Sequence, residues 1–107
     1  MKSILIYTSG DKNHGLGHVK RELVLAEELL SRGIQVDFET PADTVGHGLI
    51  EDWREDYEQV NINDFIRPHD AIIIDLEHGP GQNLVEQARQ KFDKVIVIGG
   101  VGFPPIG

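Results

Sequence analysis

A histidine and an arginine stand three residues apart directly after a glycine-rich segment, and these two side chains are well suited to chemistry. His18 and Arg21 follow Gly15 and Gly17 in the chain. A neutral imidazole near pH 7 can take a proton from water or from a hydroxyl group, and a guanidinium carries a fixed positive charge. Because residues three apart on a helix share one side, a base and a cation would lie together. Such a pair suits a reaction beside a phosphate or a carboxylate.

The segment around these residues predicts a loop that binds anions. It joins an apolar run at residues 4–7 to a long amphipathic segment that ends near Arg32, which is the pattern of a first strand-to-helix turn in an α/β domain. Gly15 and Gly17 allow a tight turn and a close approach of the backbone to a ligand. The helix that follows offers unpaired N–H groups and a partial positive charge to an anion.

The rest of the chain alternates apolar runs with amphipathic segments, which predicts strands alternating with helices. We expect an α/β fold, a Rossmann-like, doubly wound and mainly parallel sheet of about five strands, with residues 1–107 forming one domain. The expected strands are residues 3–8, 34–38, 70–75 and 94–98, with a less regular one at 57–60, and the expected helices are 18–32, 45–53 and 82–92, with one helical turn at 62–66.

Asp75 is the second candidate group, because it ends a buried strand. Ligands of doubly wound sheets bind beyond the carboxyl ends of the strands. Asp75, the glycine loop and the glycine-rich residues 99–102 meet in one crevice if the first, fourth and fifth strands are neighbours. Asp75 would then contact substrate or fix the tautomer of His18, although aspartates at strand ends also form turns. Arg21 would bind a phosphate, or pair with an acid such as Glu22, Glu28 or Asp75.

The amino-acid composition limits the kinds of partner that the chain is expected to bind. The chain has 107 residues and carries 18 acidic residues against 10 basic ones, a formal net charge of -8. This balance argues against broad electrostatic attraction to nucleic acid. With no cysteine there is no disulfide or thiolate metal site. The sequence shows neither a signal peptide nor an apolar run of membrane-spanning length, so a cytoplasmic location is the expectation.

Neither a metal nor a nucleotide-binding P-loop is expected. His14 and His18 have the spacing of a helical zinc pair, but glycines separate them and no Glu follows His14. A Walker A loop ends in Gly-Lys-Ser/Thr, whereas this loop reads Gly15-Leu16-Gly17.

The dinucleotide fingerprint is met only in part. Gly15 and Gly17 are in place, and Asp37 follows about 20 residues later, where the ribose-binding acid is expected. Lys20 occupies the position of the third glycine. No cofactor is therefore expected, and an NAD-binding domain remains the least favoured alternative.

The loop resembles a known family. Gly15, Gly17, His18 and Arg21 match the Gly-x-Gly-His-Val-x-Arg pattern of the first βα turn in GT-B glycosyltransferases. The likeness is nearest to the UDP-sugar hydrolase of pseudaminic acid biosynthesis and to the lipid-linked N-acetylglucosaminyltransferases of peptidoglycan synthesis. The resemblance implies that His18 is the catalytic base that helps water attack the sugar. It also implies that the chain is an N-terminal, acceptor-side domain, and that a second Rossmann-like domain or subunit holds the nucleotide sugar.

Two hypotheses of different classes follow. The first is the acceptor-side domain of a nucleotide-sugar-dependent glycosyltransferase or UDP-sugar hydrolase, with His18 as the base and Gly15, Gly17, Arg21 and Asp75 binding the substrate. Its partners would be a nucleotide sugar or a sugar acceptor. The second is a non-catalytic Rossmann-like module that uses the same loop to hold a small anionic ligand or a partner protein.

Overall fold

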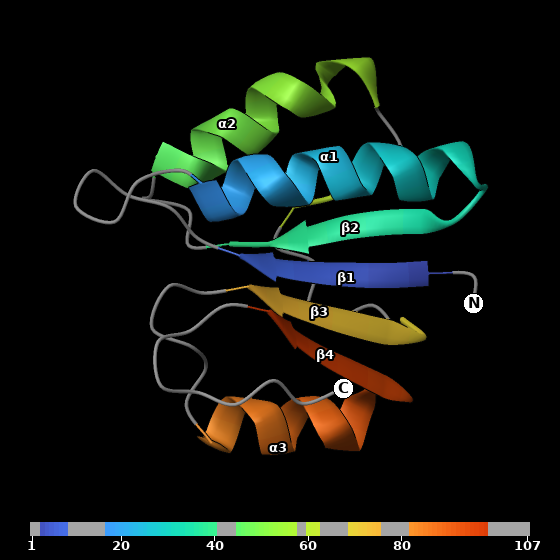
Figure 1. The fold of residues 1–107 in the computed structure, drawn as a ribbon, viewed down its shortest axis with the longest axis vertical. Coiled ribbons are helices and arrows are strands. Elements are labelled where there is room, and N and C mark those ends of the chain that lie inside the picture. Colours follow the sequence, from blue (N-terminus) through green and yellow to red (C-terminus); the bar gives the residue numbers. More distant parts are fainter. Residues whose placement is uncertain are drawn as a thin grey trace.

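The computed structural model describes residues 3–8, 17–40, 45–57, 60–62, 69–75 and 82–98. Strands and helices alternate along these residues (Figure 1). The elements are β1 (Ser3–Thr8), α1 (Gly17–Ser31), β2 (Gln35–Glu39), α2 (Val45–Trp53), the short 3-10 helix η1 (Arg54–Asp56), β3 (Ala71–Asp75), α3 (Gln82–Lys91) and β4 (Lys94–Ile98).

The four strands form one parallel sheet in the order β2-β1-β3-β4. In Figure 1, α1 and α2 lie on one side of this sheet and α3 lies on the other. The expected α/β fold with a parallel sheet is therefore confirmed, with four strands against the expected five or so. The expected first, fourth and fifth strands are indeed neighbours, as β1, β3 and β4.

The expected third strand is reduced to a bridge in the structure. Phe38 of β2 pairs in parallel with Ile62, and the N–H of Phe38 donates to the carbonyl of Asn61 at 2.9 Å. Residues 60–62 therefore lie along the outer edge of β2, slightly later in the chain than the predicted 57–60. Most of the helical turn expected at 62–66 lies outside the described residues.

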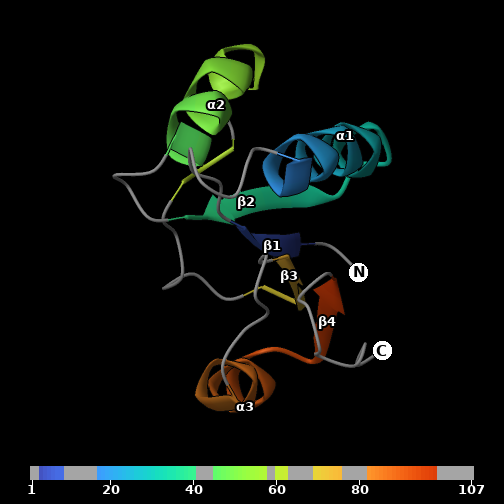
Figure 2. The same cartoon turned by 60° about the vertical axis from the view of Figure 1, so that its left-hand side comes forward.

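Each face of the sheet has its own apolar core, because side chains alternate between the faces along a strand. Figure 2 shows the sheet and the helices on its two faces from another side. One core joins β1, β2 and β3 to α1 and α2, and includes Ile4, Ile6, Val19, Ala26, Val36, Phe38, Ile50 and Ile73. The other joins β1, β3 and β4 to α3, and includes Leu5, Ile72, Ile74, Val85, Ala88, Phe92 and Val97.

Helix α1 ends at a glycine, as the sequence predicts. Gly33 has φ of 79°, in the left-handed region that glycine adopts without strain. Its N–H donates to the carbonyl of Leu30 at 3.0 Å, and the N–H of Ile34 donates to that of Leu29 at 3.1 Å. These two bonds form a Schellman motif, which closes the helix and turns the chain into β2.

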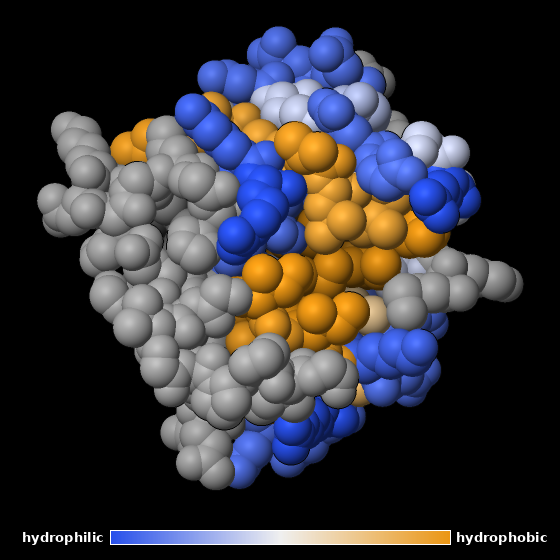
Figure 3. Space-filling view, in the orientation of Figure 1, coloured by the Kyte–Doolittle hydropathy of each residue, from blue (hydrophilic) through white to orange (hydrophobic). Residues whose placement is uncertain are grey.

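Some hydrophobic residues are exposed on the face of the molecule that Figure 3 shows. Figure 3 shows hydrophobic residues gathered over the middle of the molecule, between α1 and α3 of Figure 1. Among the described residues the large exposed hydrophobic side chains are Val24 on α1, 70% exposed, Val45 on α2, 43%, and Ile96 on β4, 37%. Ile96 is exposed because β4 stands at one edge of the described sheet.

A buried carboxylate ties β2 to the rest of the fold. Asp37 is fully buried, and its Oδ1 accepts hydrogen bonds from the backbone N–H of Asn61 at 3.1 Å, from Asn61 Nδ2 at 3.3 Å and from Gln35 Nε2 at 3.1 Å. Its Oδ2 lies 2.8 Å from Nε2 of the buried His69, whose ring packs near Phe92. Burial raises the pKa of Asp37, but the bonds from His69, Asn61 and Gln35 outweigh it, so the pKa is lowered.

The substitution Asp37→Ala is expected to destabilise the fold strongly. It leaves His69, Asn61 and Gln35 without their common acceptor, and a buried polar group that loses its partner costs about 1–3 kcal/mol. Asp52→Ala, at an exposed position on α2, is the control and should change the free energy of unfolding by no more than about 0.5 kcal/mol. Urea denaturation measures both, and equal losses in the two variants would contradict a structural role for Asp37.

Candidate active site

Two strand ends and one helix start meet at the carboxyl edge of the sheet, which Figure 2 turns toward the viewer. β1 ends at Thr8, β3 ends at Asp75, and these two residues are partners in the parallel register. Alternation along the strands places both on the face covered by α1. Helix α1 begins at Gly17, so its first turn supplies the remaining side chains of the site.

Arg21 and Asp75 form the central contact of this site. Arg21 Nη2 lies 2.8 Å from each carboxylate oxygen of Asp75, and Arg21 Nε lies 3.2 Å from Oδ2. The Asp75 side chain is completely buried, whereas that of Arg21 is 53% exposed. The hydrogen bonds to Asp75 raise the pKa of Arg21 against a smaller effect of burial. The guanidinium is thus a fixed cation that reaches from a buried anchor to the surface.

Glu22 is a second buried acid beside this pair. It is 0% exposed, and no donor group of the described residues hydrogen-bonds to either of its carboxylate oxygens. Burial raises its pKa to about 8, and the charge of Asp75 and a hydrogen bond with Asp75 add to the shift, while Arg21 opposes it. Such a bond requires a proton on one of the two carboxyl groups, so the neutral form of Glu22 is favoured at pH 7.

Glu22 belongs to the site, although the sequence predicts it only as a surface partner for Arg21. A signal for its burial was present in the sequence. Glu22 lies three residues after Val19 and four before Ala26, both of which are buried, so it falls within the buried stripe of α1. An acid within such a stripe is either paired or has a shifted pKa.

The structure brings together some of the predicted site residues and leaves others aside. Gly17 and His18 form the start of α1, in the same turn as Arg21, and Asp75 contacts Arg21. Gly15 lies outside the described residues, as do residues 99–102. The carboxylate of Asp75 is completely buried and is hydrogen-bonded to the half-exposed guanidinium of Arg21. Asp37 is on the other face of the sheet, where no ribose can reach its buried carboxylate.

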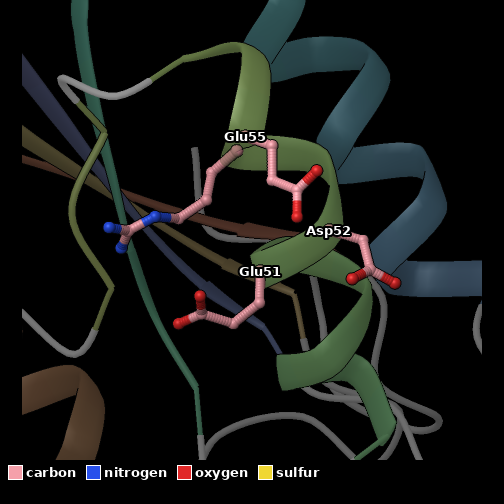
Figure 4. Close-up of a pocket in the computed structure, with 4 residues that line it drawn as sticks. Glu51, Asp52 and Glu55 are labelled. Carbon is pink, nitrogen blue, oxygen red and sulfur yellow. The ribbon is translucent and has the colours of Figure 1, made fainter.

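Two other features of the described residues do not form a catalytic or metal site. Within the described part of the chain, no three His, Cys, Asp or Glu residues are grouped as metal ligands would be. A shallow hollow of about 560 Å³ lies against the end of α2 and η1 and is lined by Glu51, Asp52, Arg54 and Glu55. Figure 4 shows that Glu51 and Asp52 point to different sides of the helix, so their carboxylates do not form a catalytic pair.

None of the described helices has both the length and the apolar character that a membrane crossing requires.

Comparison with known proteins gives no relative. No protein-family model, no curated protein and no solved structure matches the chain.

Two ion pairs that involve residues of α1, Arg21–Asp75 and Arg32–Glu28, provide a direct test of the Arg21 contact. Arg21→Met leaves the buried Asp75 without its cation and should cost about 2 kcal/mol, less than a fully buried pair because Arg21 is half-exposed. Arg32→Met removes an exposed pair between Arg32, which directly follows α1, and Glu28 of that helix, and should cost no more than about 0.5 kcal/mol. Urea denaturation at pH 7 measures both variants, and similar losses would show that Asp75 does not depend on Arg21.

Proposed function

We propose that the chain is the acceptor-side domain of a nucleotide-sugar-dependent glycosyltransferase or UDP-sugar hydrolase. The observation that carries this proposal is the half-exposed guanidinium of Arg21, held by the buried Asp75 within the first turn of α1. A cation fixed at that position, together with the N–H groups of the helix start, favours binding of a phosphate or carboxylate. The Gly-x-Gly-His-x-x-Arg pattern of the loop adds the family resemblance.

In this proposal each residue of the loop has a distinct role. His18, in its neutral form, takes a proton from water or from the acceptor hydroxyl as that oxygen attacks the sugar. Arg21 faces the negative charge of the substrate, and Gly15 and Gly17 let the backbone approach it. Asp75 holds Arg21 in place. A second Rossmann-like domain or subunit would hold the nucleotide.

A non-catalytic module for a small anionic ligand is the alternative, because the anchored Arg21 and the helix start would serve it equally well. An NAD-binding domain is disfavoured. That function needs a carboxylate at the end of β2 for the ribose, whereas Asp37 is buried in mid-strand and bonded to His69, Asn61 and Gln35.

A chemical-shift titration of the ¹⁵N-labelled chain separates these functions. UDP, UDP-N-acetylglucosamine, N-acetylglucosamine and NAD are added in turn. We expect the amides of Gly17, His18 and Arg21 to shift with the sugar ligands and not with NAD, while amides of α3 such as Val85 and Ala88 serve as internal controls. Shifts with NAD that extend to β2 would overturn the proposal. Shifts with UDP alone would favour the anion-binding module, and no shift with any of the four would contradict both.

The role of His18 is tested by activity. In the enzyme assembled with its nucleotide-binding domain, His18→Ala is expected to lower kcat by about 10²–10⁴-fold, the usual contribution of a general base. Thermal unfolding should be unchanged, and chemical-shift titration should show that UDP-N-acetylglucosamine still binds. Turnover at the unsubstituted rate would remove His18 from the catalytic role.

A further inference from the structure

Asp75 at the end of β3 and Glu22 near the start of α1 together bury more negative charge than the guanidinium of Arg21 can neutralise. Asp75 and Glu22 are both completely buried, and Arg21 makes a bidentate contact with Asp75. No donor group of the described residues hydrogen-bonds to either carboxylate oxygen of Glu22. An ionised carboxylate without a donor is too costly to keep in a dry interior, so one of the two acids must hold a proton.

The geometry decides which acid holds it. Asp75 accepts three hydrogen bonds from the guanidinium, and these stabilise its ionised form. Glu22 receives none from the described residues, and the charge of Asp75 acts against a second negative charge beside it. The proton therefore stays on Glu22, which can donate it to an oxygen of Asp75.

We propose that Glu22 is a positioning residue for Arg21: it carries a proton that it shares with Asp75, and it thereby leaves the guanidinium of Arg21 to the carboxylate of Asp75. When Glu22 loses this proton, two carboxylates compete for one guanidinium, and Arg21 no longer has a single fixed position. Among the described residues, the charged groups that act on Glu22 are Asp75 from β3 and Arg21 from its own helix, and Thr8 of β1, the register partner of Asp75, has a buried hydroxyl. His18 stands one turn earlier on α1. The effect on ligand binding rests on the proposed function, but the effect on Arg21 does not.

The proton makes folding depend on pH in a defined direction. The pKa of Glu22 is about 8 in the folded chain against an ordinary 4.5. Between these two values the folded state binds one proton more than the unfolded state at this residue. The contribution of Glu22 to stability is therefore complete below about pH 4.5 and is lost as the pH rises toward 8 and beyond.

A carbon NMR titration of the full chain tests the shared proton directly. The side-chain carboxyl carbon of Glu22 is followed from pH 5 to 10 in the chain labelled with ¹³C-glutamate, and assigned with Glu22→Gln. We expect a midpoint near 8. In Asp75→Asn the midpoint should fall by about 1–3 pH units, because the like charge is gone and Arg21 turns to Glu22. A midpoint in the ordinary range for glutamate would overturn the proposal.

The positioning role is tested on Arg21 without any ligand. The Nε–H resonance of Arg21 should move between pH 7 and 9 with the same midpoint as the Glu22 carbon. Glu22→Gln keeps a neutral group that can donate to Asp75, so in that variant the resonance should stay fixed. Glu28→Gln, at an exposed position on the same helix, is the matched control and should titrate like the unsubstituted chain. An Arg21 signal that moves equally in Glu22→Gln would contradict the positioning role.

The last measurement extends the test to binding. UDP is the probe, at pH 7 and pH 9, where its phosphates keep nearly the same charge. Affinity of the unsubstituted chain and of Glu28→Gln should fall several-fold at pH 9, and affinity of Glu22→Gln should not. If UDP binds equally at both pH values while the Arg21 signal moves, Glu22 does not affect binding through Arg21. If UDP binds at neither pH, Arg21 does not bind phosphate in this chain, which contradicts the anion site of the proposed function, and the Glu22 and Arg21 titrations still decide the shared proton.

Discussion

The bidentate contact between Arg21 and Asp75 is the interaction on which the carboxyl edge of this sheet depends. β3 is buried along its whole length, so the aspartate that ends it has no access to water. A charge in that position is tolerable only with a cation and good hydrogen-bond geometry. The cation comes from α1, and the contact therefore fixes the first turn of the helix against the middle of the sheet. Any ligand site at this edge is built around that constraint.

Two buried aspartates on opposite faces illustrate different ways to neutralise a charge. Asp37 is surrounded by donors that are themselves buried or half-buried, and its environment is closed to ligands. Asp75 relies on a guanidinium that is half-exposed. The first arrangement holds β2 to residues 60–62 and to His69, and so serves the fold. The second leaves positive charge at the surface, beside the start of a helix, and so can serve binding.

The regular elements could be predicted from the sequence because their patterns are strong. The apolar runs at residues 3–8 and 94–98 form strands with the predicted bounds, and the helix of residues 45–53 is confirmed as α2. The segment around residues 57–62 was predicted less well. Its bridge to Phe38 depends on a tertiary contact with β2, which no local pattern encodes. The order of the strands was left open by the sequence for the same reason.

The candidate site was predictable only where residue type alone carries the chemistry. Arg21 and Asp75 were both singled out, but the sequence left open whether Arg21 binds an anion or pairs with an acid. Pairing between residues 54 positions apart requires the fold. The burial of Glu22 could be predicted from its spacing on the helix. The protonation of Glu22 could not, because it depends on where the fold places Asp75. Whether His18 is a base stays a prediction.

The bridge between Phe38 and Ile62 also affects how the sheet meets other chains. An open strand edge offers unpaired N–H and C=O groups to any extended segment, and this is a common route to aggregation. Residues 60–62 occupy part of the β2 edge, which leaves β4 as the other outer strand of the described sheet. β4 is five residues long and begins with the exposed Lys94, and short, charged edge strands resist such pairing. The two edges of the described sheet thus differ: residues 60–62 cover part of the β2 edge, whereas β4 is short and carries the charge of Lys94.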